Sequence, residues 1–71
     1  MTETQKLVFA KKVALETEGL VAFVANLAIE QNEFDHFFHV LNEQYRLDTQ
    51  KFKVQLGERL FSEFLELGIP E

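Results

Sequence analysis

The only proline of this chain is Pro70, next to its last residue, so almost the whole sequence lacks the residue that most strongly interrupts helices. Only three glycines accompany it. Between a few capping signals, hydrophobic residues recur three and four positions apart, which is the spacing of one face of an α-helix. The sequence therefore predicts an all-α fold: a small bundle of three to four helices, completed or extended by homodimerisation.

The chain has 71 residues and no cysteine, so neither a disulfide nor a thiolate–metal site can stabilise it. In so small a domain, the entropy lost on ordering the chain offsets most of the gain from burial. An apolar content of 46% with eight phenylalanines is a large load for this length. We therefore expect a core dense in aromatic rings, and some apolar surface buried against a second copy of the chain.

One domain is predicted over residues 1–71, with helices at roughly 3–18, 20–31, 33–46 and 49–67. Thr2 and Gln5 have the spacing of a capping box at the start of the first helix. Asn32 is expected to cap the third helix, and Asp48 or Thr49 the fourth. The sequence after residue 67 contains the usual signals that end a helix.

Two segments and two glycines leave the boundaries open. Residues 6–10, "KLVFA", and residues 51–56, "KFKVQL", also fit short strands, although helical spacing over residues 49–67 favours a helix for the second. Gly57 lies inside this pattern and costs about 1 kcal/mol relative to alanine, which fits a close helix crossing. Gly19 is expected to end or kink the first helix.

The second predicted helix is apolar on nearly every side. One side carries, at helical spacing, Leu20, Phe23, Val24 and Leu27, and the other side holds Val21, Ala25, Ala28 and Ile29. A helix of this kind is typically central and covered on several faces. We therefore expect residues 20–31 to form the middle of the bundle.

The stretch "NEFDHFFHVL", residues 32–41, combines two histidines, two carboxylates and three phenylalanines. At about 100° per residue, the aromatic residues and Leu41 share one face, whereas His36, His39 and Glu43 share the other. Glu33 and His36 form an E-x-x-H pair, as in di-metal helical bundles, but such a site needs a second pair and further glutamates. The pattern indicates a solvated face, and we expect no metal ligands here.

Composition excludes several other functions. The net charge of −5 argues against direct nucleic-acid binding, which depends on lysine and arginine. The longest nearly apolar run, residues 19–29, is too short to span a membrane. Ser62 is the only serine, and no glycine-rich phosphate loop exists. We expect a cytoplasmic protein that is not an enzyme, with no catalytic residue, no cofactor and no membrane partner.

The breadth of the fourth predicted helix suggests how the chain functions. Besides its main apolar stripe, Val54, Phe61 and Leu65 form a second stripe. Aromatic and leucine side chains grouped on a helix are typical of interface centres. The sequence therefore predicts a regulator, adaptor or inhibitor that forms a homodimer and binds another protein.

Two alternatives stay open. The first is a helical metal-binding protein that uses Glu33, His36, His39 and Glu43. The second is an acidic mimic of nucleic acid that blocks a DNA-binding protein. The twelve acidic residues are spread along the sequence, so only the fold could bring them into one band.

Overall fold

The structure is a computed structural model that describes residues 2–67 of the chain. It contains the helices α1 (Glu3–Glu16), α2 (Gly19–Gln31), α3 (Asp35–Leu47), α4 (Thr49–Leu56) and α5 (Glu58–Glu66). No strand occurs in this part of the chain. The predicted all-α class is confirmed, and both segments that also fitted strands are helical.

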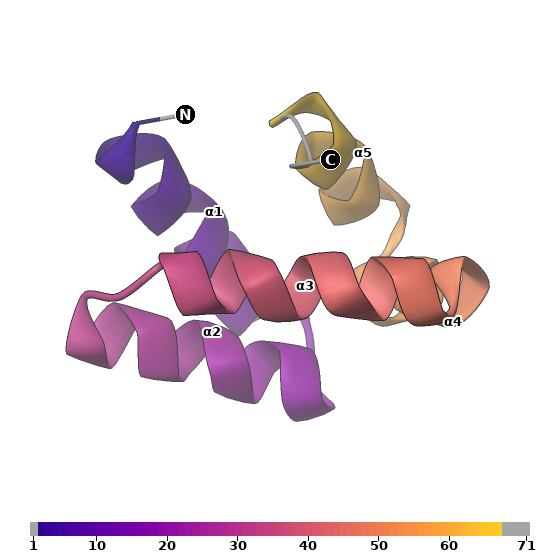
Figure 1. Ribbon diagram of the computed structural model, residues 1–71, viewed down its shortest axis with the longest axis horizontal. Helices are drawn as coiled ribbons and strands as arrows, with labels where there is room; N and C mark the ends of the chain where they lie inside the picture. The colour runs from indigo at the N-terminus through magenta and orange to yellow at the C-terminus, as the bar shows by residue number, and fades with distance from the viewer. Residues whose placement is uncertain (1, 68–71) are drawn as a thin grey trace.

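The helices form two groups around one core. As Figure 1 shows, α2 and α3 run side by side in opposite directions, and α1 and α5 extend from the same side of α3. α1 packs most extensively on α2, whereas α4 contacts both α3 and α5. The whole molecule measures 28 × 25 × 19 Å. α5 is thus brought back beside α1, far from it in sequence.

A continuous set of aromatic rings fills the core, as expected from the phenylalanine content. Among the described residues, seven rings contact one another with centroid separations of 5.2 to 6.4 Å: Phe9, Phe37, Phe38, Tyr45, Phe52, Phe61 and Phe64. Phe64 of α5 has neighbours on three helices: Phe9 of α1, Tyr45 of α3 and Phe52 of α4. The ring cluster therefore ties four of the helices together.

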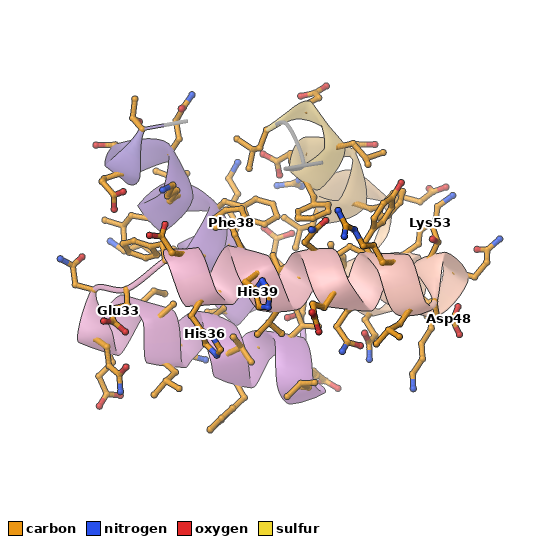
Figure 2. The ribbon with its side chains drawn as sticks, in the orientation of Figure 1. Glu33, His36, Phe38, His39, Asp48 and Lys53 are labelled. Carbon is orange, nitrogen blue, oxygen red and sulfur yellow. The ribbon has the colours of Figure 1, made fainter. Side chains whose placement is uncertain are left out.

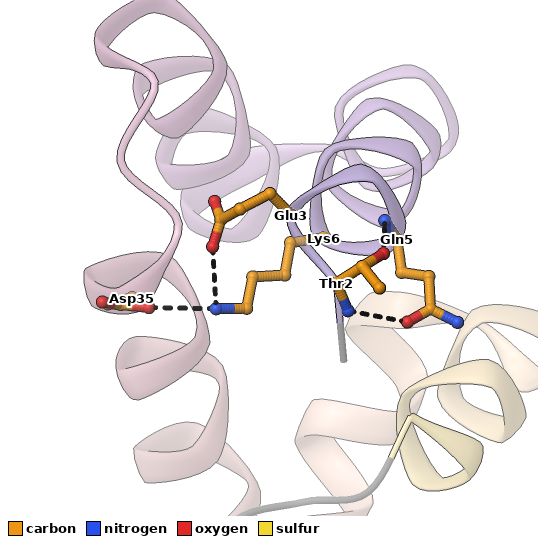
Figure 3. Close-up of polar contacts among 5 residues, drawn as sticks. All are labelled: Thr2, Glu3, Gln5, Lys6 and Asp35. Carbon is orange, nitrogen blue, oxygen red and sulfur yellow. Dashed lines mark hydrogen bonds and ion pairs between the residues drawn. The ribbon is translucent and has the colours of Figure 1, made fainter.

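Two of the expected helix caps are present. The Gln5 N–H donates to Thr2 Oγ1 over 3.1 Å, and the Thr2 N–H donates to Gln5 Oε1 over 2.8 Å, which completes the capping box (Figure 3). At the start of α4, Asp48 Oδ1 accepts from the Lys51 N–H over 3.1 Å. These contacts satisfy backbone donors that a helix start leaves without partners.

The prediction that Asn32 caps the third helix is wrong. Asn32 instead ends α2 in the left-handed conformation, with φ 55° and ψ 41°, and its N–H donates to the Ala28 and Ile29 carbonyls. Asparagine tolerates this conformation better than most residues. Phe34 takes the cap position of α3, where its ring is buried in the core and, having no acceptor atom, makes no side-chain hydrogen bond. α3 consequently starts at Asp35, two residues later than expected.

The prediction of one helix over residues 49–67 is also wrong, and residues 2–67 form five helices where three to four were predicted. The helix is interrupted at Gly57, which has φ 86° and ψ 154°. The bend brings Phe52 and Phe64 into contact, with ring centroids 5.2 Å apart. A straight helix would separate these rings by about 18 Å along its axis, so burial of both in one small core requires the break.

The first helix is shorter than expected. It ends at Glu16, and Thr17 and Glu18 are extended before Gly19 begins α2 with φ 74°. Gly19 therefore neither ends nor kinks α1, and instead forms the first residue of the next helix. The expected end signal at Gly68 and Pro70 lies outside the described residues.

Truncating Phe64 should remove most of the stability of the protein. Phe64→Ala deletes a fully buried ring that contacts three helices, and such changes cost about 3–5 kcal/mol. Phe23→Ala is the matched control, because this ring is mostly exposed and should cost about 0.5 kcal/mol or less. Urea unfolding followed by circular dichroism measures both; equal losses would contradict the assignment of Phe64 to the core.

The cap of α4 can be tested separately. Asp48→Ala should lower the free energy of unfolding by about 1 kcal/mol, because the Lys51 N–H loses its acceptor. Asp48→Asn keeps an oxygen at the same position and should be nearly neutral. If both variants lost the same amount in urea unfolding, the charge of Asp48 would matter and not its hydrogen bond.

Candidate interaction surface

The outer side of α2 carries large apolar side chains that the fold leaves exposed. Leu20 is 53% exposed and Phe23 is 65% exposed, while Leu27 is half-buried. These residues are three and four positions apart, so they lie on one side of the helix. No charged residue occurs between Gly19 and Ile29. We call Leu20, Phe23 and Leu27 the α2 face.

The expectation that residues 20–31 form a central helix is therefore wrong. The buried side of α2 consists of small or β-branched residues, namely Val21, Val24, Ala25 and Ala28. Such short side chains let the neighbouring backbones approach closely, so α1 and α3 cover this side and leave the bulky side in water. The alanines in the sequence were the signal that distinguished the inner side from the outer one.

A further exposed leucine lies at the same end of the α1–α2 hairpin. Leu15 of α1 is 86% exposed, and only Thr17 and Glu18 separate α1 from the start of α2. Because the linker is so short, Leu15 and Leu20 both lie near the turn of the hairpin. Neither residue is among the interface candidates predicted from the sequence.

The three predicted interface residues lie on two helices, α4 and α5, and not on one. Val54 of α4 is 80% exposed and Leu65 of α5 is 43% exposed. Phe61 is half-buried and packs on Tyr45 and Phe52, with ring centroids 6.0 Å apart in both pairs. The break at Gly57 places Val54 on a separate helix from the other two. Their role in an interface stays a prediction.

A shallow depression on α5 includes two of these three residues. Its lining comprises Phe61, Leu65, Lys53, Glu58, Arg59 and Ser62. The Lys53 Nζ lies 5.8 Å from the centroid of the Phe61 ring, a cation–π distance. Charged side chains thus surround the exposed apolar atoms here, in contrast to the uncharged α2 face.

The histidines lie where the sequence predicted, opposite the core. Figure 2 shows His36 and His39 on the near side of α3, and Phe38 is on the other side, where its ring stacks on Phe9 of α1. His39 Nε2 is 3.5 Å from Glu43 Oε1, one turn along the helix. Among residues 2–67, no group of three or more potential metal ligands is close enough to hold an ion. This face therefore gives no geometric support to a metal site.

Among the described residues, three ion pairs connect helices that are distant in sequence, and one of them joins Arg59 Nη2 of α5 to Glu16 Oε2 of α1 over 3.7 Å. Lys12 Nζ of α1 lies 2.6 Å from Glu63 Oε1 of α5, at the edge of a groove of about 380 Å³ between these helices. Lys6 Nζ lies 3.2 Å from both Glu3 Oε1 and Asp35 Oδ1, which links α1 to the start of α3 (Figure 3). The hydrogen bond that the Lys6 ammonium donates to Asp35, followed by the one it donates to Glu3, raises the pKa of Lys6 above its ordinary value of 10.5.

Comparison of this chain with protein-family models, with curated proteins and with solved structures gives no match. None of the helices formed by residues 2–67 has the length and apolar character required to cross a lipid bilayer. Among the surfaces described above, the α2 face combines the most exposed aromatic ring with the absence of charge. It is therefore the best candidate for an interaction site.

The raised pKa of Lys6 gives a test of its ion pairs. A lysine with a raised folded-state pKa stabilises the fold fully below its unfolded value of 10.5, and this contribution is lost as the pH rises through the folded value. We expect wild type to be slightly more stable than Lys6→Gln at neutral pH, with the difference vanishing in strongly alkaline solution. Urea unfolding at several pH values measures it; a difference that persisted in alkali would contradict the ion-pair origin.

Proposed function

We propose that this chain is a small helical interaction module that acts by binding another protein through the α2 face. The observation that carries the proposal is the exposure of Phe23, 65%, on a helix with no charged residue from Gly19 to Ile29. Exposed aromatic rings are frequent energetic centres of interfaces, and charged residues are depleted there. A chain that binds another protein without catalysing a reaction would act as a regulator, adaptor or inhibitor.

The shape of the α2 face indicates the complementary surface of the partner. Leu20 and Leu27 are seven residues apart, about 10 Å along the helix axis, with Phe23 between them. A protruding helix side of this length fits an apolar groove, in which three anchors at helical spacing occupy successive pockets. The partner is therefore expected to supply the groove, and this chain the helix.

The charges at the ends of α2 indicate the electrostatic character of that groove. Glu18 precedes the helix and Glu30 lies in its last turn, and both are exposed. α2 itself contains no basic residue. With a net charge of −5 for the chain, a groove flanked by lysine or arginine would be attracted and oriented, which raises the rate of association. We infer a partner with basic rims around an apolar groove.

Self-association is a further part of the proposal. Large side chains remain exposed elsewhere on the described surface, including Val54, 80% exposed, and Leu65, 43% exposed. In the predicted interface they are joined by Phe61, which is already half-buried within its own chain. A second copy of the chain could cover these residues. The cytoplasmic location of the protein also stays a prediction.

Substitutions on the two surfaces distinguish the α2 face from the predicted stripe. The partner is first captured from a lysate of the native host and identified by mass spectrometry. The dissociation constant of its complex with this chain is then measured. Phe23→Ala should cost about 2 kcal/mol, or about 30-fold in affinity, as for the central ring of an interface. Val54→Ala is the control and should leave this affinity unchanged.

The reverse result would move the binding site to α4 and α5. Loss of affinity in Val54→Ala with full affinity in Phe23→Ala would refute the α2 face. Because both side chains are mostly exposed, neither variant should unfold, and circular dichroism verifies this. Sedimentation of wild type at micromolar concentration tests self-association independently, since a monomer at every concentration would remove that part of the proposal.

A further inference from the structure

Gly57 is the single residue between α4 and α5, and helical hydrogen bonding continues on both of its sides. Its N–H donates to the Lys53 carbonyl over 2.8 Å, and its own carbonyl accepts from the Phe61 N–H over 2.9 Å. Both contacts have the i to i−4 register of an uninterrupted α-helix. The break therefore results from the backbone of Gly57 alone.

The conformation of this residue is one that only glycine adopts readily. Its φ of 86° and ψ of 154° fall in a region where a side chain would be strained. An added Cβ would meet no atom within 4 Å, so the strain would be local to the backbone. No side chain caps the start of α5. If Gly57 became helical, the N–H groups of residues 58–60 could donate to the carbonyls of residues 54–56.

The apolar pattern also continues through the break. Phe52, Leu56, Leu60 and Phe64 are spaced by four and are all buried. On a continuous helix, residues four apart lie on neighbouring turns of one broad face. The sequence thus encodes a helical register across Gly57, and the bent arrangement is only one way to bury these side chains.

The bent and straight forms cannot both make the same contacts within one chain. Phe52 and Phe64 have ring centroids 5.2 Å apart in the bent form. On a straight helix they would be about 18 Å apart along the axis. Straightening would therefore withdraw Phe64 from Phe9 and Tyr45 and leave its place in the core empty. The group that fits this place without any change is α5 of a second copy.

We propose that Gly57 is a hinge through which two copies of the chain exchange α5 and form a domain-swapped dimer. In this dimer residues 49–66 form one helix about 27 Å long, comparable with the 28 Å length of the whole molecule. The contacts of Phe64 with Phe9 and of Lys12 with Glu63 then form between chains. The exchange gives the self-association proposed above a specific route and does not use the α2 face.

The first arm of the test is Gly57→Ala. Alanine is strained in the bent form and favours the helical form, so both effects shift the chain toward exchange. We expect the dimer dissociation constant to fall by about a hundredfold, since two hinges change per dimer. Gly19→Ala is the matched control, because Gly19 also has positive φ, 74°, and open space for a Cβ. Sedimentation of both variants and wild type measures the effect, and the control should behave as wild type.

The second arm identifies the exchanged contact. Lys12→Glu and Glu63→Lys each place like charges at the shorter of the two ion pairs that join α1 to α5. A swapped heterodimer of the two variants restores an attractive pair in both cores, whereas each homodimer contains two repulsive ones. Native mass spectrometry of an isotopically marked mixture, with and without Gly57→Ala, should therefore show more heterodimer than random pairing gives. A dimer formed through any other surface gives the random share.

The outcomes separate the hinge from self-association itself. If wild type is a dimer, the two charge variants pair at random and Gly57→Ala does not change the dimer dissociation constant, then self-association stands and the hinge is overturned. If wild type is a monomer but the two charge variants, each also carrying Gly57→Ala, form more heterodimer than random pairing gives, the hinge is upheld and wild-type self-association is removed. A Gly57→Ala variant that stays folded and monomeric overturns the hinge, as does equal dimerisation of Gly19→Ala. If Gly57→Ala does not fold, the hinge is decided by the share of heterodimer in a concentrated mixture of Lys12→Glu and Glu63→Lys that both keep Gly57.

Discussion

The packing of Phe64 against rings from three other helices is the contact on which the rest of the fold depends. The helices have 8 to 14 residues, and isolated helices of this length are marginal in water. Without disulfides, their stability must come from tertiary burial. Phe64 contributes to this burial where the two ends of the described chain meet, because its ring joins α5 to α1 by packing on Phe9.

The features that sequence predicted best are those decided within a few residues. The aromatic stripe of α3 was predicted because its polar residues occupy the opposite side, which leaves one possible orientation toward the core. The Thr2–Gln5 box and the Asp48 cap were predicted because a cap is a contact between residues three positions apart. In these cases local preference and tertiary packing agree, so a local pattern suffices.

The features that sequence missed are those in which tertiary packing overrides a local preference. The helical pattern over residues 49–67 is continuous, but one core can hold both Phe52 and Phe64 only if the chain bends at Gly57. Asn32 is a good helix start by type, yet the burial of Phe34 displaces that start and leaves Asn32 to end α2. The predicted interface stripe assumed one straight helix, whereas Val54 lies on α4 and the other two residues lie on α5, and its role in an interface stays a prediction.

The candidate surface was missed because α2 lacks a polar side. Where apolar residues occupy nearly every side, periodicity cannot say which side faces inward, and only side-chain size can. The alanine side admits close neighbours and is buried, so Phe23 is left outside. This division has a consequence for binding: α2 packs chiefly on α1 and α3, and an exchange of α5 would leave its outer side untouched. A swapped dimer would then display two α2 faces on one particle, and a partner with two matching grooves would bind it with an avidity that neither face provides alone.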